Sequence, residues 1–89
     1  MKNIAKEVKL DKNAFKTYIS DILKNVKSDY IDLNSGDIHR ELGGYPGKNH
    51  QMSICCNVMR ELMLTNDLIV YEPPKGNGAS FTIRYNKRR

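Results

Sequence analysis

The hydrophobic and polar positions of this chain change their period several times, which predicts a mixture of helices and strands. From residue 12 to residue 27 the apolar side chains follow the spacing of one helical face. These positions are Phe15, Tyr18, Ile19, Ile22, Leu23 and Val26. The pattern predicts a helix over residues 12–27, and Asp11 is a suitable N-cap because its carboxylate can accept hydrogen bonds from the first turn.

A short strand and a second helix are expected next. Residues 30–33 alternate in a way typical of a strand, with the two aliphatic side chains on one side. Asn34 or Ser35 can then cap a helix from about residue 36 to residue 42. The Gly43-Gly44 pair ends this helix, because glycine accepts the left-handed backbone that closes many helices.

A third helix follows a turn at Tyr45-Pro46-Gly47. We expect it to begin between Asn49 and Ser53 and to run to about Leu64. At 100° per residue, its apolar side consists of Met52, Cys55, Met59, Leu62 and Met63, with Val58 at the margin. The opposite, outward side consists of Asn49, His50, Ser53, Asn57, Arg60 and Glu61.

The last part of the chain has the pattern of a β-hairpin. Residues 68–72 are rich in β-branched and aromatic side chains, and the turn 73–78 is rich in proline and glycine. Residues 80–86 alternate, with Phe81, Ile83 and Tyr85 on one face. The order is therefore helix, short strand, helix, turn, helix and two-stranded hairpin. This order predicts the α+β class and a winged helix.

The length of 89 residues suits a single domain over residues 1–89. Residues 1–10 are expected to form a flexible basic arm, although their spacing also permits a short amphipathic helix. Residues 87–89 form a short basic tail.

The net charge of +5 favours a polyanionic partner such as double-stranded DNA. The basic residues are concentrated toward the two ends, because residues 31–67 hold three Lys/Arg against five Asp/Glu. No apolar run approaches membrane-spanning length, and the first residues lack the apolar segment of a secretion signal. Cys55 and Cys56 are adjacent and cannot form a disulfide framework within one chain. These features predict a cytoplasmic protein without membrane contact.

A winged helix places its third helix in the major groove and its hairpin tip on the DNA backbone. Amide side chains can read adenine, arginine can read guanine, and lysine can neutralise phosphate. The candidate DNA contacts are Tyr45, Lys48, Asn49, His50, Ser53, Asn57, Arg60, Lys75, Arg84, Lys87 and Arg88. Each also has a plain interpretation, as part of a tight turn, a solvated helix face or a solubilising tail.

Catalysis and metal binding have little support in the sequence. A nucleophile elbow, a phosphate-binding loop and metal-ligand spacing are all missing. A metal site from His39, His50 and the two cysteines is weak, because adjacent helical residues diverge by about 100°. We expect no cofactor, and we expect His39 to form hydrogen bonds within the fold.

Two stretches, Ser35 to Met59 and Pro73 to Tyr85, together resemble a small, poorly characterised family of bacterial and phage proteins. Such segments occur alone or beside HNH-type nuclease domains, so the resemblance implies a DNA-targeting accessory. The chain has no nuclease motif of its own, and cleavage is therefore not implied.

The sequence thus predicts a non-enzymatic DNA-binding protein, with a role in transcription regulation as one form of it. The alternative is a protein-interaction module, such as a phage-type inhibitor of a nucleic-acid-targeting enzyme, which the acidic centre favours. A homodimer is compatible with either function.

Overall fold

The structure is a computed structural model, and it describes residues 10–47 and 50–88. Its elements follow the order α1 (Lys12–Lys24), β1 (Tyr30–Asn34), α2 (Ser35–Leu42), α3 (Met52–Glu61), β2 (Leu68–Tyr71) and β3 (Thr82–Asn86). The predicted α+β class and the order of the elements are confirmed. The expected arm lies almost wholly outside the described residues.

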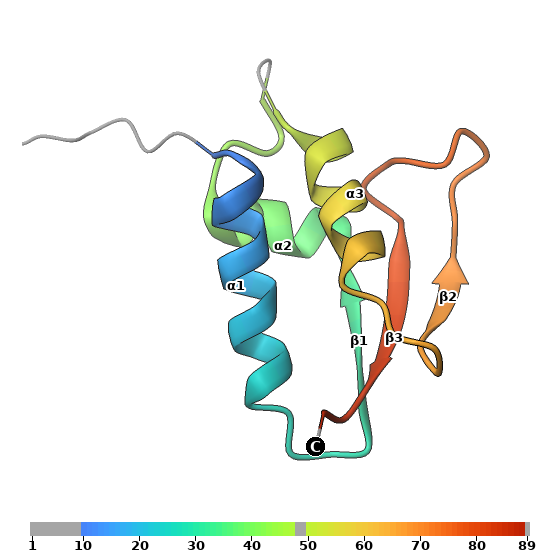
Figure 1. The fold of residues 1–89 in the computed structure, drawn as a ribbon. Helices are drawn as coiled ribbons and strands as arrows, with labels where there is room; N and C mark the ends of the chain where they lie inside the picture. The colour runs from blue at the N-terminus through green and yellow to red at the C-terminus, as the bar shows by residue number, and fades with distance from the viewer. Residues whose placement is uncertain (1–9, 48–49, 89) are drawn as a thin grey trace, which may run out of the picture.

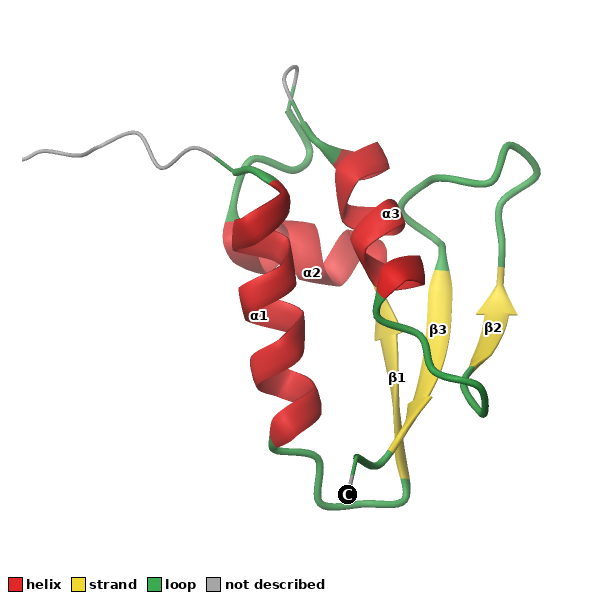
Figure 2. Cartoon of the chain, in the orientation of Figure 1, coloured by secondary structure: helices red, strands yellow, loops and turns green. Residues whose placement is uncertain are grey.

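The three strands form one antiparallel sheet in the order β1-β3-β2 (Figure 1). The last strand of the chain is therefore the central one. It pairs with the first strand, although the two are far apart in the sequence. The helices gather on one side of this sheet (Figure 2). This arrangement makes two layers with a single core between them.

The core is built from the predicted apolar faces. Phe15, Ile19 and Leu23 of α1 are buried, as are Ile83 and Tyr85 of β3. In α3 the buried side chains are Met52, Cys55, Cys56, Val58 and Met59. Val58 was expected only at the margin of the inner face, and burial of Cys56 was not predicted. The Sγ atom of Cys56 lies 3.5 Å from the carbonyl oxygen of Gly78, so the segment after β2 covers this side of the helix.

The first helix is shorter than the predicted range 12–27. Asp11 is its N-cap, as expected, and accepts a hydrogen bond from the backbone N–H of Ala14. The helix ends at Lys24 because the side chain of Asn25 donates to the carbonyl oxygen of Asp21 at 2.8 Å. A helix continuing through residue 25 would use that carbonyl for its own backbone ladder.

The second helix begins one residue before the predicted start. The Asn34 side chain accepts from the backbone N–H of Asp37, so the cap is Asn34 and Ser35 is already helical. Gly43 ends the helix with φ of 100°, which confirms the predicted role of this glycine.

The third helix begins within the predicted window but ends at Glu61 instead of about Leu64. The backbone N–H of Leu64, which a longer helix would donate to the carbonyl oxygen of Arg60, donates instead to the nearby Asp67 side chain. The carbonyl oxygen of Leu62, just after the helix, accepts from the distant Arg88.

The two hairpin strands are also shorter than predicted. The strand expected over residues 80–86 starts at Thr82, because the carbonyl oxygens of Ala79 and Phe81 accept hydrogen bonds from the first residues of α2. The strand expected over residues 68–72 ends at Tyr71, with a register irregularity between Ile69 and Tyr71.

Candidate nucleic-acid interface

The outward side of α3 carries exposed polar side chains. Ser53 and Asn57 are four residues apart and therefore lie on one side of the helix, and both are exposed. The rotation of the helix is set by Cys55 and Met59, which are fully buried on the core side. The core thus fixes the direction in which the hydroxyl and the amide point, and both can donate and accept hydrogen bonds.

Arg60 joins this helix to the loop between β2 and β3. Its guanidinium donates to the Asn77 side chain at 2.6 Å, to the carbonyl oxygen of Gly76, and to Glu72 at 3.3 Å. The group also lies 4.4 Å from the centre of the Phe81 ring. Arg60 therefore acts as a clamp within the fold, and it holds the loop against α3.

The clamp places the loop tip beside the exposed side of α3. Lys75 precedes Gly76 and is exposed. The β2–β3 loop and the first turns of α3 lie at the same end of the molecule (Figure 1). We call this surface the α3-loop face and define it by Ser53, Asn57, Arg60, Lys75 and Asn77. Of these residues, Asn77 was missed from sequence, because its role depends on the distant Arg60.

His39 links the end of α2 to the start of α3. The backbone N–H of Gln51 donates to its Nε2 atom at 2.9 Å, so this nitrogen is an acceptor. The Nδ1 atom therefore carries the proton and donates to the carbonyl oxygen of Gly43 at 3.1 Å. The ring is fully buried, which confirms that His39 forms hydrogen bonds within the fold.

Tyr45 and His50 lie against this link. The Tyr45 ring is 5.5 Å from the His39 ring and 5.5 Å from the His50 ring. Arg40 lies over Tyr45 at 5.4 Å, and its guanidinium pairs with Asp37 at 3.0 Å. His50 is exposed, and its Nδ1 atom accepts from the N–H of Met52 at the start of α3. Two further predicted contacts, Lys48 and Asn49, lie outside the described residues.

Arg84 and Lys87 lie on β3 and just after it, where other parts of the chain hold them. Arg84 lies on the sheet, where it makes two hydrogen bonds to Asp32 at 2.8 and 3.1 Å and stacks 4.1 Å from the Tyr30 ring. The hydrogen bonds from Arg84 hold the pKa of Asp32 below its usual range. Lys87 is exposed, but its backbone N–H donates to Asp29 at the end of β3 opposite the loop tip. The structure therefore does not join these cations and Lys75 into one basic strip.

Arg88 is held by a buried carboxylate, so it does not belong to a free tail. Asp67 accepts from Arg88 at 3.1 Å and from the backbone N–H groups of Leu64 and Asn86, each at 2.8 Å. Burial alone would raise the pKa of Asp67, but these hydrogen bonds outweigh burial and hold the pKa below its usual range. Arg88 also donates to the carbonyl oxygen of Leu62. Arg88 therefore fastens the end of the described chain to Asp67 and to the residue after α3.

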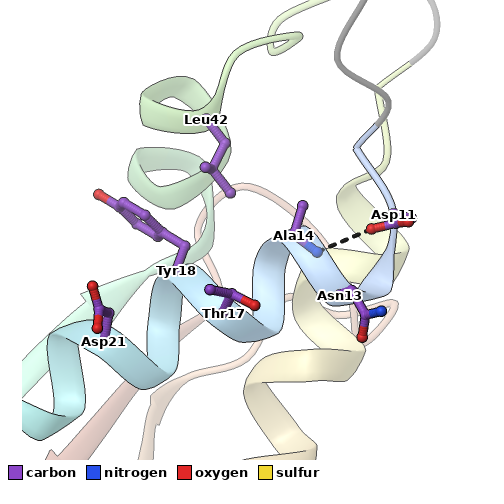
Figure 3. Close-up of a pocket in the computed structure, with 7 residues that line it drawn as sticks. All are labelled: Asp11, Asn13, Ala14, Thr17, Tyr18, Asp21 and Leu42. Atoms are coloured by element: carbon purple, nitrogen blue, oxygen red, sulfur yellow. Dashed lines mark hydrogen bonds between the residues drawn. The ribbon is translucent and has the colours of Figure 1, made fainter.

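The surface between α1 and α2 has the opposite electrostatic character. A shallow pocket there is lined by Asp11, Asn13, Ala14, Thr17, Tyr18, Asp21 and Leu42 (Figure 3). The lining contains two carboxylates and no lysine or arginine, which disfavours a phosphate on this side. Burial, together with the charge of Glu41, raises the pKa of Tyr18. The α3-loop face is therefore the better candidate for a polyanion.

Cys55 does not have the chemistry of a reactive thiol. Burial raises the pKa of Cys55 to about 12, with a smaller contribution from Cys56.

Within residues 10–47 and 50–88, no three His, Cys, Asp or Glu side chains come together as metal ligands would. In the same part of the chain, no helix has the length and apolar character needed to cross a membrane.

No protein-family model, curated protein or solved structure matches this chain. The candidate interface therefore rests on the residues and contacts described above.

Proposed function

We propose that the chain is a non-enzymatic, winged-helix protein that binds double-stranded DNA through the α3-loop face. The order of its elements, with two strands after the third helix and the last strand in the middle of the sheet, is that of a winged helix. On this interpretation α3 is the helix that enters the major groove, and the β2–β3 loop is the wing.

The observation that carries the proposal is the contact between α3 and the loop. Arg60 bonds to Asn77 and Gly76, so the exposed Asn57 and the exposed Lys75 belong to one surface. An α-helix fits into the major groove, where the side-chain amide of Asn57 can form hydrogen bonds with a base edge. Lys75 can neutralise a neighbouring phosphate. The guanidinium of Arg60 is already hydrogen-bonded within the fold, so Arg60 positions this surface and does not itself contact DNA.

The strength of binding should be limited by the small number of cations on this face. Each phosphate that a cation such as Lys75 neutralises lowers the affinity about 3- to 4-fold between about 50 and 200 mM salt. Sequence-specific contacts from α3 then add to this salt-dependent part.

A matched pair of lysine variants tests the proposal. Lys75→Ala removes the cation at the loop tip, whereas Lys24→Ala removes an exposed cation from the far end of α1. Both variants lower the net charge equally. Fluorescence anisotropy with a labelled duplex should show that Lys75→Ala weakens binding and lowers the slope of log affinity against log salt by about 1, while Lys24→Ala stays close to the wild type.

An NMR titration of the same duplex locates the contact. Amide shifts should change at Ser53, Asn57 and Lys75 and should stay constant at Thr17 on α1. Absence of duplex binding at about 50 mM salt would refute the proposal. Equal effects of the two lysine variants would show that binding depends on the net charge of the protein and not on the α3-loop face.

A further inference from the structure

The strand β2 exposes an unusual amount of apolar surface. Leu68 is 56% exposed, Ile69 40%, Val70 50% and Tyr71 51%. We call these four residues the apolar edge. In β3, by contrast, buried residues alternate with half-buried polar ones. The hydrophobic side chains of β2 therefore do little to build the core of this chain.

The backbone of β2 is also open on one side. In the described part of the chain, the sheet order β1-β3-β2 gives β2 a single neighbouring strand. The N–H and C=O groups on its other side point away from the sheet, and such groups readily pair with another strand. At the other edge of the sheet, β1 carries Asp32, which is paired with Arg84.

Only part of the usual protection against such pairing is present here. Edge strands are commonly guarded by short length, a bulge, lysine, proline or an inward charge, and β2 has the first two, being four residues long with an irregularity at Val70. The apolar edge contains no charged residue and no proline. The two flanking carboxylates are already bonded within the fold, Asp67 to Arg88 and Glu72 to Arg60.

We propose that the apolar edge pairs with the apolar edge of a second copy of this chain, in antiparallel orientation about a two-fold axis. Burial of the exposed parts of these four residues in both copies amounts to roughly 800 Å², which is below the about 1,000 Å² of a stable specific interface and corresponds to a weak pair. Leu64, which is 59% exposed and lies shortly before β2, adds further apolar surface.

A second copy fits because the strand is complementary to itself. In antiparallel self-pairing, every residue from Leu68 to Tyr71 meets a residue of the same set, so apolar faces apolar on both sides of the new sheet. No buried charge is left without a partner in that arrangement. The inference is independent of DNA binding, because it rests on β2 alone.

Val70 is the best position for a test. It has no partner residue in β3, so a substitution there leaves the pairing of β2 with β3 intact. Val70→Lys places like charges near the two-fold axis and supplies the missing protection. Thr17→Lys, on the exposed side of α1, is the matched control with the same change in charge.

Sedimentation velocity of the full chain, from about 5 to 500 µM, should show a concentration-dependent species of twice the 10.2 kDa chain mass. Val70→Lys should raise the dimer dissociation constant at least about 10-fold, and Thr17→Lys should leave it unchanged. Circular dichroism of both variants checks that the fold is retained.

Amide hydrogen exchange provides a second measurement. Protection of Ile69 and Val70 should rise with protein concentration in the wild type and should stay constant in Val70→Lys. A wild-type chain that remains monomeric over the whole range, including one whose edge binds an unrelated extended peptide, overturns the proposal. A dimer that is unaffected by Val70→Lys overturns it as well.

Discussion

Replacement of Asp67 by asparagine tests the buried ion pair between Asp67 and Arg88. Only 1% of the Asp67 side chain is exposed, and its two oxygens accept from two backbone N–H groups and from Arg88. In Asp67→Asn one oxygen becomes an NH2 group, which cannot accept from the N–H of Leu64 or Asn86. Arg88 loses its charged partner at the same time.

The size of the effect follows from these lost contacts. A buried N–H without an acceptor costs about 1–3 kcal/mol, and hydrogen bonds to a charged group contribute about 1.5–3 kcal/mol. Allowing for relaxation around the new amide, we expect the free energy of unfolding at pH 7 to fall by about 3 kcal/mol. For a domain of this size, that corresponds to a loss of roughly 12–24 °C in Tm.

The effect should depend on pH with a defined sign. Since the folded state lowers the pKa of Asp67, its ionised form stabilises the fold above the unfolded pKa, which is near 3.9. This stabilisation is lost as the pH falls through the lower, folded pKa. The difference between the wild type and Asp67→Asn should therefore be full at neutral pH and should shrink in acid, below about pH 4.

Urea unfolding followed by circular dichroism at several pH values measures both quantities. The control is Asp21→Asn, the same substitution at an exposed aspartate of α1, which should change stability by less than about 0.5 kcal/mol. A stability difference below about 1 kcal/mol for Asp67→Asn at pH 7 would refute the reasoning. So would a difference that stays constant into acid.

Two further substitutions test close packing and the histidine link. Gly36→Ala should destabilise the fold by about 1–3 kcal/mol despite the better helix propensity of alanine, because the new Cβ would lie 2.8 Å from the carbonyl oxygen of Ala79. His39→Phe should cost about 2–4 kcal/mol, because the carbonyl of Gly43 and the N–H of Gln51 lose their partner. Thermal unfolding measures both effects.

Exposed positions supply the controls for these two variants. His50→Phe before α3 makes the same substitution as His39→Phe at an exposed site, and Asn13→Ala places alanine at an exposed position of α1. Each should alter stability much less than its buried counterpart. A Gly36→Ala or His39→Phe chain as stable as its control would contradict the contacts described here.

The elements themselves follow from short-range features of the sequence. The spacing of Phe15, Ile19 and Leu23 indicates a helix, and the alternation around Ile83 indicates a strand, because each pattern matches a backbone period. Asp11 as cap and Gly43 as stop act within one turn of their own helix. Local patterns of this kind can be predicted without knowledge of the tertiary structure.

The role of each basic side chain was decided only by the tertiary structure. As isolated residues in the sequence, Arg60, Arg84 and Arg88 all read as candidates for phosphate contact. In the fold, each meets a carboxylate that lies between 12 and 52 positions away: Glu72 for Arg60, Asp32 for Arg84 and Asp67 for Arg88. Which carboxylate meets which arginine depends on strand register and on loop closure, and neither is encoded in a local period.

The exposure of β2 likewise depends on the order of strands. Leu68 to Tyr71 indicates a strand by its composition, but composition does not reveal whether that strand is central or at the edge. Placement of β3 between β1 and β2 buries Ile83 and Tyr85 and leaves the apolar edge exposed. The sequence by itself therefore determined the elements and their caps. The tertiary structure decided which charges are already paired and which apolar strand faces outward, because both properties depend on contacts between distant parts of the chain.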